Sequence, residues 1–193
     1  MEFKYAVTAS IVVYQNDKKV LSQSINSFLA TSLPIHLFIV DNSPTDDLKD
    51  LTSDERVTYI FNDSNIGFGA AHNIALHQAL KLSEYHIVLN PDVYFDRGTI
   101  EKLYHYMNQN RGVGLVMPKV LYPDNSIQYL CKLLPTPKDL FLRRFMKGNK
   151  NELEKRNQIF ELKFTNYSSE MSVPYLSGCF MFLRCSAISE VGL

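Results

Sequence analysis

The sequence has no excess charge of either sign and few cysteines. Its formal net charge at pH 7 is zero, with 20 Lys and Arg against 20 Asp and Glu. Nothing in the overall charge therefore points to nucleic acid as a partner. The three cysteines, Cys131, Cys179 and Cys185, form no CxxC pair. Such a sparse and odd count suits buried thiols in a reducing cytoplasm.

Long apolar runs, internal repeats and low-complexity tracts are also missing. No run approaches the roughly 18 residues of a membrane span. The opening "MEFKYAVTAS" lacks the basic segment and long apolar core of a signal peptide. We therefore expect a cytoplasmic protein, with peripheral contact at the inner face of the plasma membrane left open because it needs no span. Its 193 residues, 46% of them hydrophobic, suffice for one domain with a substantial core.

Apolar runs alternate with segments of helical spacing along the first two thirds of the chain. Continuous β-rich runs are typical of strands buried on both faces, while apolar side chains spaced like Leu21, Ile25 and Phe28 indicate a helix. The predicted strands are residues 5–14, 35–40, 57–61, 86–89, 113–118 and 173–184; the predicted helices are 20–32, 70–83, 100–110 and one from 185. This order predicts an α/β fold with a mostly parallel central sheet flanked by helices.

Right-handed crossovers place the carboxyl ends of parallel strands at one edge, where ligands bind in open α/β sheets. That edge should carry Tyr14, Asp41, Asn42, the loop 62–69 and residues 90–92. We also expect "DNSPTDD" after the second strand to start a short helix, and Thr99 to cap the helix that follows it.

The segment "NDSNIGFGAAHN" is the most distinctive one. Its glycines, Gly67 and Gly69, let the backbone approach a ligand closely, and the helix start that follows offers free N–H groups to a phosphate. A tight turn is the structural alternative, although one glycine would suffice for it. The dinucleotide-binding fingerprint is rejected, because His72 occupies the third glycine position and the segment follows the third strand.

Two acids stand at predicted strand ends. Asp41 could bind a base or ribose, but taken alone it is better explained as an Asx-turn or helix cap. Asp92 in "HIVLNPDVYF" could be a turn former, a catalytic base, or a ligand of Mg²⁺ or Mn²⁺ on a diphosphate. One carboxylate does not exclude a Mg²⁺ site, because phosphates and waters complete it. The pair would also fit a phosphoacceptor site. No Ser-His-Asp or Cys-His set is indicated, and the histidines are interpreted as structural or surface residues.

The last third is different in character. "LYPDNSIQYL" predicts a hairpin around Pro123, Asp124 and Asn125. Between Lys138 and Lys163 there are eight Lys and Arg against four Asp and Glu. A solvated face explains this excess most simply, and a segment near lipid-linked phosphates is the sharper alternative.

Taken together, these stretches resemble the family 2 glycosyltransferases of the GT-A fold, and most closely the rhamnosyltransferase-like members that build bacterial surface polysaccharides such as O-antigen. The matching pieces are "SIVVY", "FIVDNSPTDD", "NDSNIGFGAAHNIAL", "VLNPDV", "GLVMPKVLYPDNSIQ", "LPTP" and "YLSGCFMFLRCSAISEVGL". They follow the family order over nearly the whole chain. The glycine loop followed by "VLNPDV" at this spacing is the specific part.

The resemblance implies one GT-A-like domain over residues 1–193, incomplete at its C-terminal end. Residues 1–118 would form the nucleotide-sugar-binding half and 119–193 would begin the acceptor-binding half. It implies an inverting transfer, assisted by Mg²⁺ or Mn²⁺, from dTDP-rhamnose or a UDP-sugar to a glycan or lipid-linked glycan.

The implied nucleotide-sugar-binding residues lie in the loops after the strands; they are Tyr14, Asp41, Asn65, Gly67, Gly69, Asn73 and Asp92. Within this set Asp41 would read the base edge, and residues 65–73 would line the ribose and diphosphate. Asp92 would be the acid of the D-x-D-like motif and the metal ligand. Gly178 would lie on the strand that floors the acceptor side.

The sequence departs from the family pattern at two places. Asn90 stands where many relatives have the first Asp of D-x-D, although Asn-Pro-Asp is common in the rhamnosyltransferase-like subgroup. Relatives also continue after the "EVGL" stretch with an acidic pair that supplies the general base, so we expect that base beyond Leu193. The chain is then part of a longer or disrupted enzyme, or else a module that binds a nucleotide sugar without transferring it.

Two other classes remain as alternatives. A nucleotidyltransferase places its glycine-rich loop after the first strand, where "VVYQNDKK" has no glycine. A receiver-like module phosphorylated at Asp41 or Asp92 would be smaller, and would leave residues 134–184 unexplained.

Overall fold

The computed structural model describes residues 3–135 and 150–193. The chain divides into two compact units. Unit 1 comprises Met1–Met117 with Gly178–Leu193, and unit 2 comprises Pro118–Ser177.

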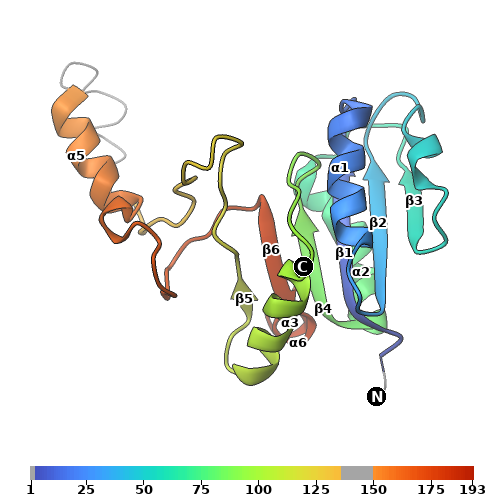
Figure 1. Ribbon diagram of the computed structural model, residues 1–193. Helices are drawn as coiled ribbons and strands as arrows, with labels where there is room; N and C mark the ends of the chain where they lie inside the picture. The colour runs from blue at the N-terminus through green and yellow to red at the C-terminus, as the bar shows by residue number, and fades with distance from the viewer. Residues whose placement is uncertain (1–2, 136–149) are drawn as a thin grey trace. The chain divides into compact units, whose positions relative to one another are not determined.

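Unit 1 is built on a six-stranded sheet with the strand order β3-β2-β1-β4-β6-β5 (Figure 1). Its strands are β1 (Tyr5–Val13), β2 (Ile35–Asp41), β3 (Val57–Phe61), β4 (Ser83–Leu89), β5 (Leu115–Val116) and β6 (Phe180–Arg184). The first four run parallel, and β6 is antiparallel to both β4 and β5. The predicted α/β architecture with a mostly parallel sheet is confirmed.

Helices cover both faces of this sheet (Figure 1). The helices of unit 1 are α1 (Lys18–Leu29), α2 (Phe68–Leu82), α3 (Thr99–Gln109) and α6 (Cys185–Val191), with one 3₁₀ turn, η1 (Lys49–Thr52). Helices α1 and α3 bury Phe28, Ile100 and Met107 in the larger core cluster, on the face opposite α2. Helix α2 packs small side chains, Ala71 and Ala75, against the other face, which lets it lie close to the strands.

The strand register brings the carboxyl ends of the parallel strands level with one another. Asp41 at the end of β2 pairs with Val13 of β1 on one side and with Phe61 of β3 on the other. Strand β6 runs in the opposite direction, so it begins at this same edge, where Phe180 pairs with Leu89. The residues just before β6, including Gly178, therefore lie at the edge where the parallel strands end.

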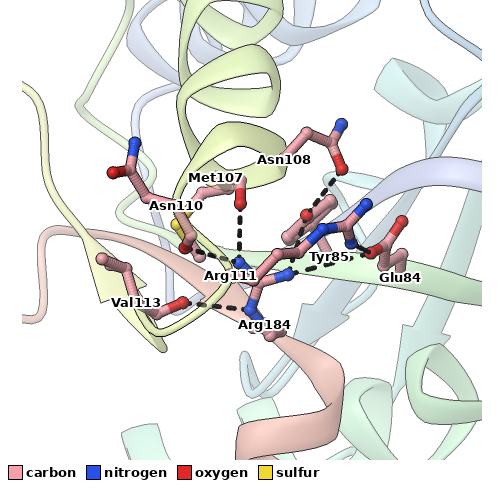
Figure 2. Close-up of polar contacts among 8 residues, drawn as sticks. All are labelled: Glu84, Tyr85, Met107, Asn108, Asn110, Arg111, Val113 and Arg184. Atoms are coloured by element: carbon pink, nitrogen blue, oxygen red, sulfur yellow. Dashed lines mark hydrogen bonds and ion pairs between the residues drawn. The ribbon is translucent and has the colours of Figure 1, made fainter.

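A buried arginine fixes the opposite end of β6 (Figure 2). The guanidinium of Arg184 donates to the carbonyl oxygens of Met107, Asn110 and Val113 at 2.7 to 3.2 Å. It also donates to the hydroxyl of Tyr85 at 2.9 Å. Because two of these carbonyls belong to the last turn and the C-cap of α3, the positive charge satisfies a helix C-terminus and ties it to the sheet.

Some predicted boundaries are wrong. Thr99 is the first residue of α3 and makes no capping hydrogen bond, because Gly98, with φ of 85°, occupies the cap position. In "DNSPTDD", Asp41 ends β2 and residues 43–45 form bends; the short helix expected after this segment is the 3₁₀ turn η1, which starts at Lys49. The predicted strands at 113–118 and 173–184 shrink to β5 and β6.

Unit 2 contains α5 (Lys150–Phe160) and the 3₁₀ turn η2 (Lys163–Thr165). The predicted hairpin around Pro123 is confirmed by an antiparallel bridge between Leu121 and Ile127. The hydroxyl of Tyr167 makes two hydrogen bonds with the backbone of Cys131. It accepts the N–H of Cys131 at 2.9 Å and donates to the carbonyl oxygen of Cys131 at 3.1 Å. Part of the basic stretch and half of "LPTP" lie outside the described residues, since residues 136–149 are not described.

Across the residues that the structure describes, no helix combines the length and apolar character that crossing a membrane requires. All three cysteines are free thiols, and Cys131 and Cys185 are buried as predicted.

Candidate functional site

The carboxylate of Asp41 is fully buried at the end of β2. Its Oδ1 accepts the N–H of Ser43 at 2.7 Å, which is the predicted Asx-turn contact. Its Oδ2 accepts the hydroxyl of Tyr59, a residue of β3. Burial, and then the bond to Asp41, raise the pKa of the Tyr59 phenol, so it stays a donor at neutral pH. Asp41 thus holds the ends of β2 and β3 in place.

Side-chain amides organise the loop that follows β3. Asn62 donates to the Oδ1 of Asn42 at 2.8 Å, and Asn42 donates toward Asn65 and the carbonyl of Gly67 at 3.5 and 3.4 Å. The Oδ1 of Asn65 also accepts the N–H of Gly67 at 3.0 Å. The oxygen of Asn65 is therefore turned into the loop. Its Nδ2 has no partner within residues 3–135 and 150–193, so it is available to a ligand.

The start of α2 is exposed and uncapped. Gly67 holds the N-cap position with φ of 89° and ψ of 162°, a conformation open essentially to glycine alone. It provides no side-chain cap, and the first helical hydrogen bond shown by the structure is that of Ala71 to the carbonyl of Gly67. Residues 67–70 are all exposed. The N–H groups of the first turn are therefore free for an anion.

Gly69 differs from Gly67 in what its backbone requires. Its φ is not positive, and a Cβ placed on it would meet nothing within 4 Å. Neither strain nor crowding within the described residues thus demands glycine there. The missing side chain leaves open space beside the free N–H groups, as a ligand approaching the backbone would need. Asn73, one turn further along α2, is half-buried.

Asp92 follows β4 at the same edge of the sheet. It is exposed, and in residues 3–135 and 150–193 it makes no hydrogen bond or ion pair. The turn there is closed by the backbone, with the N–H of Val93 donating to the carbonyl of Asn90 at 3.2 Å. A turn former would use its carboxylate, so this geometry favours a free carboxylate that can take a ligand. No cluster of three or more His, Cys, Asp or Glu able to hold a metal occurs in the described residues.

The glycine loop and the start of β6 meet in space. A Cβ placed on Gly178 would lie 3.9 Å from Cε1 of Phe68, the first residue of α2. The N–H of Asn90 donates to the carbonyl of Cys179 at 2.9 Å, which ties the end of β4 to the same segment. The loop that was predicted to hold a diphosphate thus lies beside the residue that was predicted to face the acceptor.

Large apolar side chains are exposed around this edge. Each follows or ends a parallel strand or begins α2; they are Tyr14, Phe61, Ile66, Phe68 and Tyr94. The N–H of Tyr14 donates to Asn16, and its ring is half exposed. Apolar and aromatic side chains around a few free polar groups are typical of ligand sites.

A buried polar chain runs beneath α2. Nδ1 of His72 lies 2.7 Å from the hydroxyl of Ser10, and Ser10 lies 2.8 Å from Nε2 of His86. Nδ1 of His86 lies 2.8 Å from the hydroxyl of Thr8, which in turn lies 2.7 Å from Ser83. All five side chains are buried. The prediction of structural histidines is met at these two positions.

The carbonyl of Tyr85, which can only accept, sets the direction of the protons in this chain. Ser83 donates to it at 2.9 Å, so the oxygen of Ser83 accepts the proton of Thr8. Each imidazole then donates from Nδ1, and Ser10 donates to the Nε2 that faces it. This assignment satisfies every close contact in the chain. It leaves Nε2 of His72 as a buried acceptor without a partner among the described residues.

The sequence model of the family described as "Glycosyl transferase family 2" matches residues 9–192. The chain belongs to this family. The matched range includes all the loops that follow the parallel strands of this glycosyltransferase chain.

Several curated proteins are similar to the chain. An N-acetylglucosaminyl-diphospho-decaprenol L-rhamnosyltransferase of Mycobacterium tuberculosis is 26% identical over 179 residues, covering 85% of this chain and 56% of the relative. An uncharacterized glycosyltransferase of Haemophilus influenzae is 29% identical over 171 residues, covering 83% and 66%. The chain thus spans about half the length of the mycobacterial relative.

A solved structure supports the GT-A fold. The mannosyltransferase PcManGT from Pyrobaculum calidifontis, in complex with GDP-Man and Mn²⁺, matches with a TM-score of 0.61 and 15% identity. The match covers 98% of this chain and 47% of that one. At this identity the likeness concerns the fold alone.

The predicted site residues of the family 2 chain all lie at one edge of unit 1, but they differ in accessibility. Asn65, Gly67, Gly69 and Asp92 are exposed, whereas Asp41 is buried beneath the loops. Sequence reasoning missed the amide network of Asn42 and the contact of Phe68 with Gly178. The sequence did contain a signal for the Phe68 contact: Ile66 and Phe68 alternate with glycines in an otherwise polar loop. Large apolar residues that gather in an exposed loop often mark a contact or ligand site.

Proposed function

We propose that this chain provides the nucleotide-sugar-binding part of an inverting glycosyltransferase. The sugar is rhamnose, carried by dTDP, with a UDP-sugar as the alternative donor. The acceptor is a glycan or lipid-linked glycan of a growing cell-surface polysaccharide. The L-rhamnosyltransferase name of the mycobacterial relative, which includes a diphospho-decaprenol acceptor, supports both the sugar and the lipid-linked acceptor.

One observation carries the proposal: the uncapped, glycine-flanked start of α2 shares a sheet edge with the free carboxylate of Asp92. The N–H groups of the first turn would bind the diphosphate, helped by the helix dipole. Asn65 would donate its free amide N–H to the ribose or a phosphate oxygen. Tyr14 would border the nucleoside. Asp41 would act through the loop it holds, because its carboxylate is buried.

The donor set fits Mg²⁺ or Mn²⁺ held by Asp92 together with the diphosphate. Asp92 supplies a hard oxygen, and such sites use one or two carboxylates with phosphates and waters completing the shell. A bound ion would neutralise the charge that develops on the leaving diphosphate. The N–H groups of α2 would stabilise the same charge from the protein side.

The remaining parts of the reaction follow from the family resemblance. The general base is expected in the acidic pair that relatives carry after the region matching Leu193. The transfer would take place at the cytoplasmic face of the plasma membrane, where the basic residues of the last third could contact lipid-linked phosphates.

Asp92→Asn is expected to remove the metal-dependent part of nucleotide binding. The amide keeps the size of the side chain but loses the charge that holds the ion, so dTDP or UDP with Mn²⁺ should bind at least about tenfold more weakly. Isothermal titration of the 193-residue chain with and without Mn²⁺ measures this difference.

Asp96→Asn is the matched control, because Asp96 is an exposed acid in the same loop. It should bind as the wild type does. Equal binding by wild type and Asp92→Asn, with and without Mn²⁺, would exclude the metal role of Asp92.

Gly67→Ala and Gly69→Ala are expected to separate folding from binding. Alanine at Gly67 meets a backbone conformation that costs about 1 to 3 kcal/mol, which urea denaturation will show. Alanine at Gly69 should fold as well as the wild type, since a methyl there meets no atom. It should still weaken nucleotide binding, because the methyl fills the space of the phosphate. A Gly69→Ala chain with unchanged nucleotide affinity contradicts the close approach of a ligand.

A further inference from the structure

Phe68 exposes its ring at the meeting point of the proposed donor and acceptor sides. It is the first residue of α2, it is 48% exposed, and it directly follows the glycine at the N-cap. Its Cε1 lies 3.9 Å from the position of a Cβ on Gly178. The neighbouring residues Gly67, Gly69 and Gly178 carry no side chains that could cover the exposed part of the ring.

His72 supports the ring from within the protein. The two ring centroids are 4.4 Å apart with an interplanar angle of 68°, an edge-to-face contact one helical turn apart. The imidazole cannot move freely, because it is buried and hydrogen-bonded to Ser10 at 2.7 Å. Phe68 is therefore an exposed side chain with a fixed support, unlike an ordinary surface phenylalanine.

The chemistry of a nucleotide sugar places its sugar near this ring. The sugar is joined to the second phosphate through a single oxygen. If the first turn of α2 holds the diphosphate, the sugar must lie within reach of the residues of that turn. A pyranose has an apolar C–H face that packs on an aromatic ring, and a deoxysugar adds an apolar methyl group.

We infer that the ring of Phe68 is the surface on which the transferred sugar packs, with His72 as the residue that positions the ring against Gly178. This inference rests on the proposed function and adds a residue that determines the affinity for the sugar. Phe68 would then strengthen the binding of the nucleotide sugar relative to the free nucleoside diphosphate, because only the nucleotide sugar carries the sugar that packs on the ring.

The test compares the affinity for dTDP with that for dTDP-rhamnose, each with Mn²⁺, by isothermal titration of the full chain. In Phe68→Ala, dTDP should bind within about twofold of the wild type, and the additional affinity from the sugar should fall by about five- to tenfold. Phe68→Tyr keeps the ring and should retain that additional affinity. His72→Gln should reduce it by a smaller factor while dTDP binding stays unchanged.

Phe3→Ala is the control, because Phe3 is an exposed phenylalanine before β1, at the opposite end of the strands. It should change neither affinity. The inference is overturned if Phe68→Ala weakens dTDP as much as dTDP-rhamnose, or if the wild type gains no affinity from the sugar. A wild-type chain that binds neither dTDP nor UDP, alone or as a nucleotide sugar, overturns the proposed function itself.

Discussion

Replacing Arg184 with methionine is expected to lower the free energy of unfolding by about 3 to 5 kcal/mol. This is a large part of the roughly 5 to 15 kcal/mol that holds a domain of this size together. Urea denaturation followed by circular dichroism measures the loss.

The reason is the number of groups that depend on one guanidinium (Figure 2). Arg184 is buried and donates to three carbonyl oxygens and one hydroxyl, and its Nη1 lies 3.7 Å from Glu84. Methionine fills a similar volume but donates nothing. The carbonyl oxygens of Met107 and Val113 would then lose their donor, whereas that of Asn110 still accepts the N–H of Val113. Each buried acceptor without a partner costs about 1 to 3 kcal/mol.

Two further variants separate geometry from charge. Arg184→Lys keeps the charge but lacks the planar fork, so an intermediate loss is expected. Arg111→Met removes the other arginine at Glu84, whose ion pair is 2.7 Å long but whose side chain is 67% exposed, and it should cost less than about 1 kcal/mol. If Arg111→Met cost as much as Arg184→Met, the burial of Arg184 would not be the cause.

The strands that the sequence predicts best are those whose apolar runs are continuous. In β1 and β2 the predicted and observed ranges agree closely, because strands buried on both faces need apolar residues at nearly every position. The range of β3 also agrees, although β3 lies at the edge of the sheet and is only partly buried. Strand β4 begins earlier than predicted, at Ser83. Its first residues are polar, and Ser83 is buried with Thr8 of β1 beside it as a hydrogen-bond partner. The sequence around Ser83 does not reveal this partner, because Thr8 lies 75 residues away along the chain.

The start of β6 shows a second limit of prediction from sequence. Residues 173–184 form one β-rich run, yet only Phe180–Arg184 belongs to the sheet of unit 1. Tyr175 pairs instead with Lys132 in unit 2. Periodicity identifies residues that can form strands, but the partner that accepts their hydrogen bonds decides where a strand ends.

The candidate site was predictable at the level of loops and less so at the level of roles. The strand-end rule located Asp41 and Asp92 correctly, because topology alone brings these ends together. It could not separate a buried carboxylate bonded to Tyr59 from an exposed one with no partner in the described residues. That difference depends on contacts between strands, as does the contact of Phe68 with Gly178.

Acid is expected to destabilise unit 1 through two of its buried histidines. As the pH falls from about 6.5 to about 4, the free energy of unfolding should drop by several kcal/mol, because two buried imidazoles stay neutral in the folded chain. Burial lowers the pKa of His72 to about 4, and burial followed by the charge of His72 lowers that of His86 to about 3.

The sign follows from proton uptake by the unfolded chain. Unfolded histidines bind protons near their ordinary pKa of 6.5, while the folded ones do not. Stability is therefore complete above pH 6.5 and is lost as the pH falls toward the folded pKa values, by on the order of 3 kcal/mol for each imidazole. Protonation would also break the buried polar chain, since a proton added to His86 would point at the hydroxyl proton of Ser10.

Denaturation midpoints between pH 7.5 and 4.5, outside the range where Asp54 titrates with its pKa of about 2, test this directly. His86→Gln should be less stable at pH 7.5 but should lose less stability on acidification, because one titrating group is gone. His77→Gln is the control, since His77 is exposed on the same helix as His72. It should follow the wild-type curve. If the His86→Gln chain shows the full wild-type acid dependence, the proton uptake belongs to other groups, and the buried polar chain does not set the acid limit of the fold.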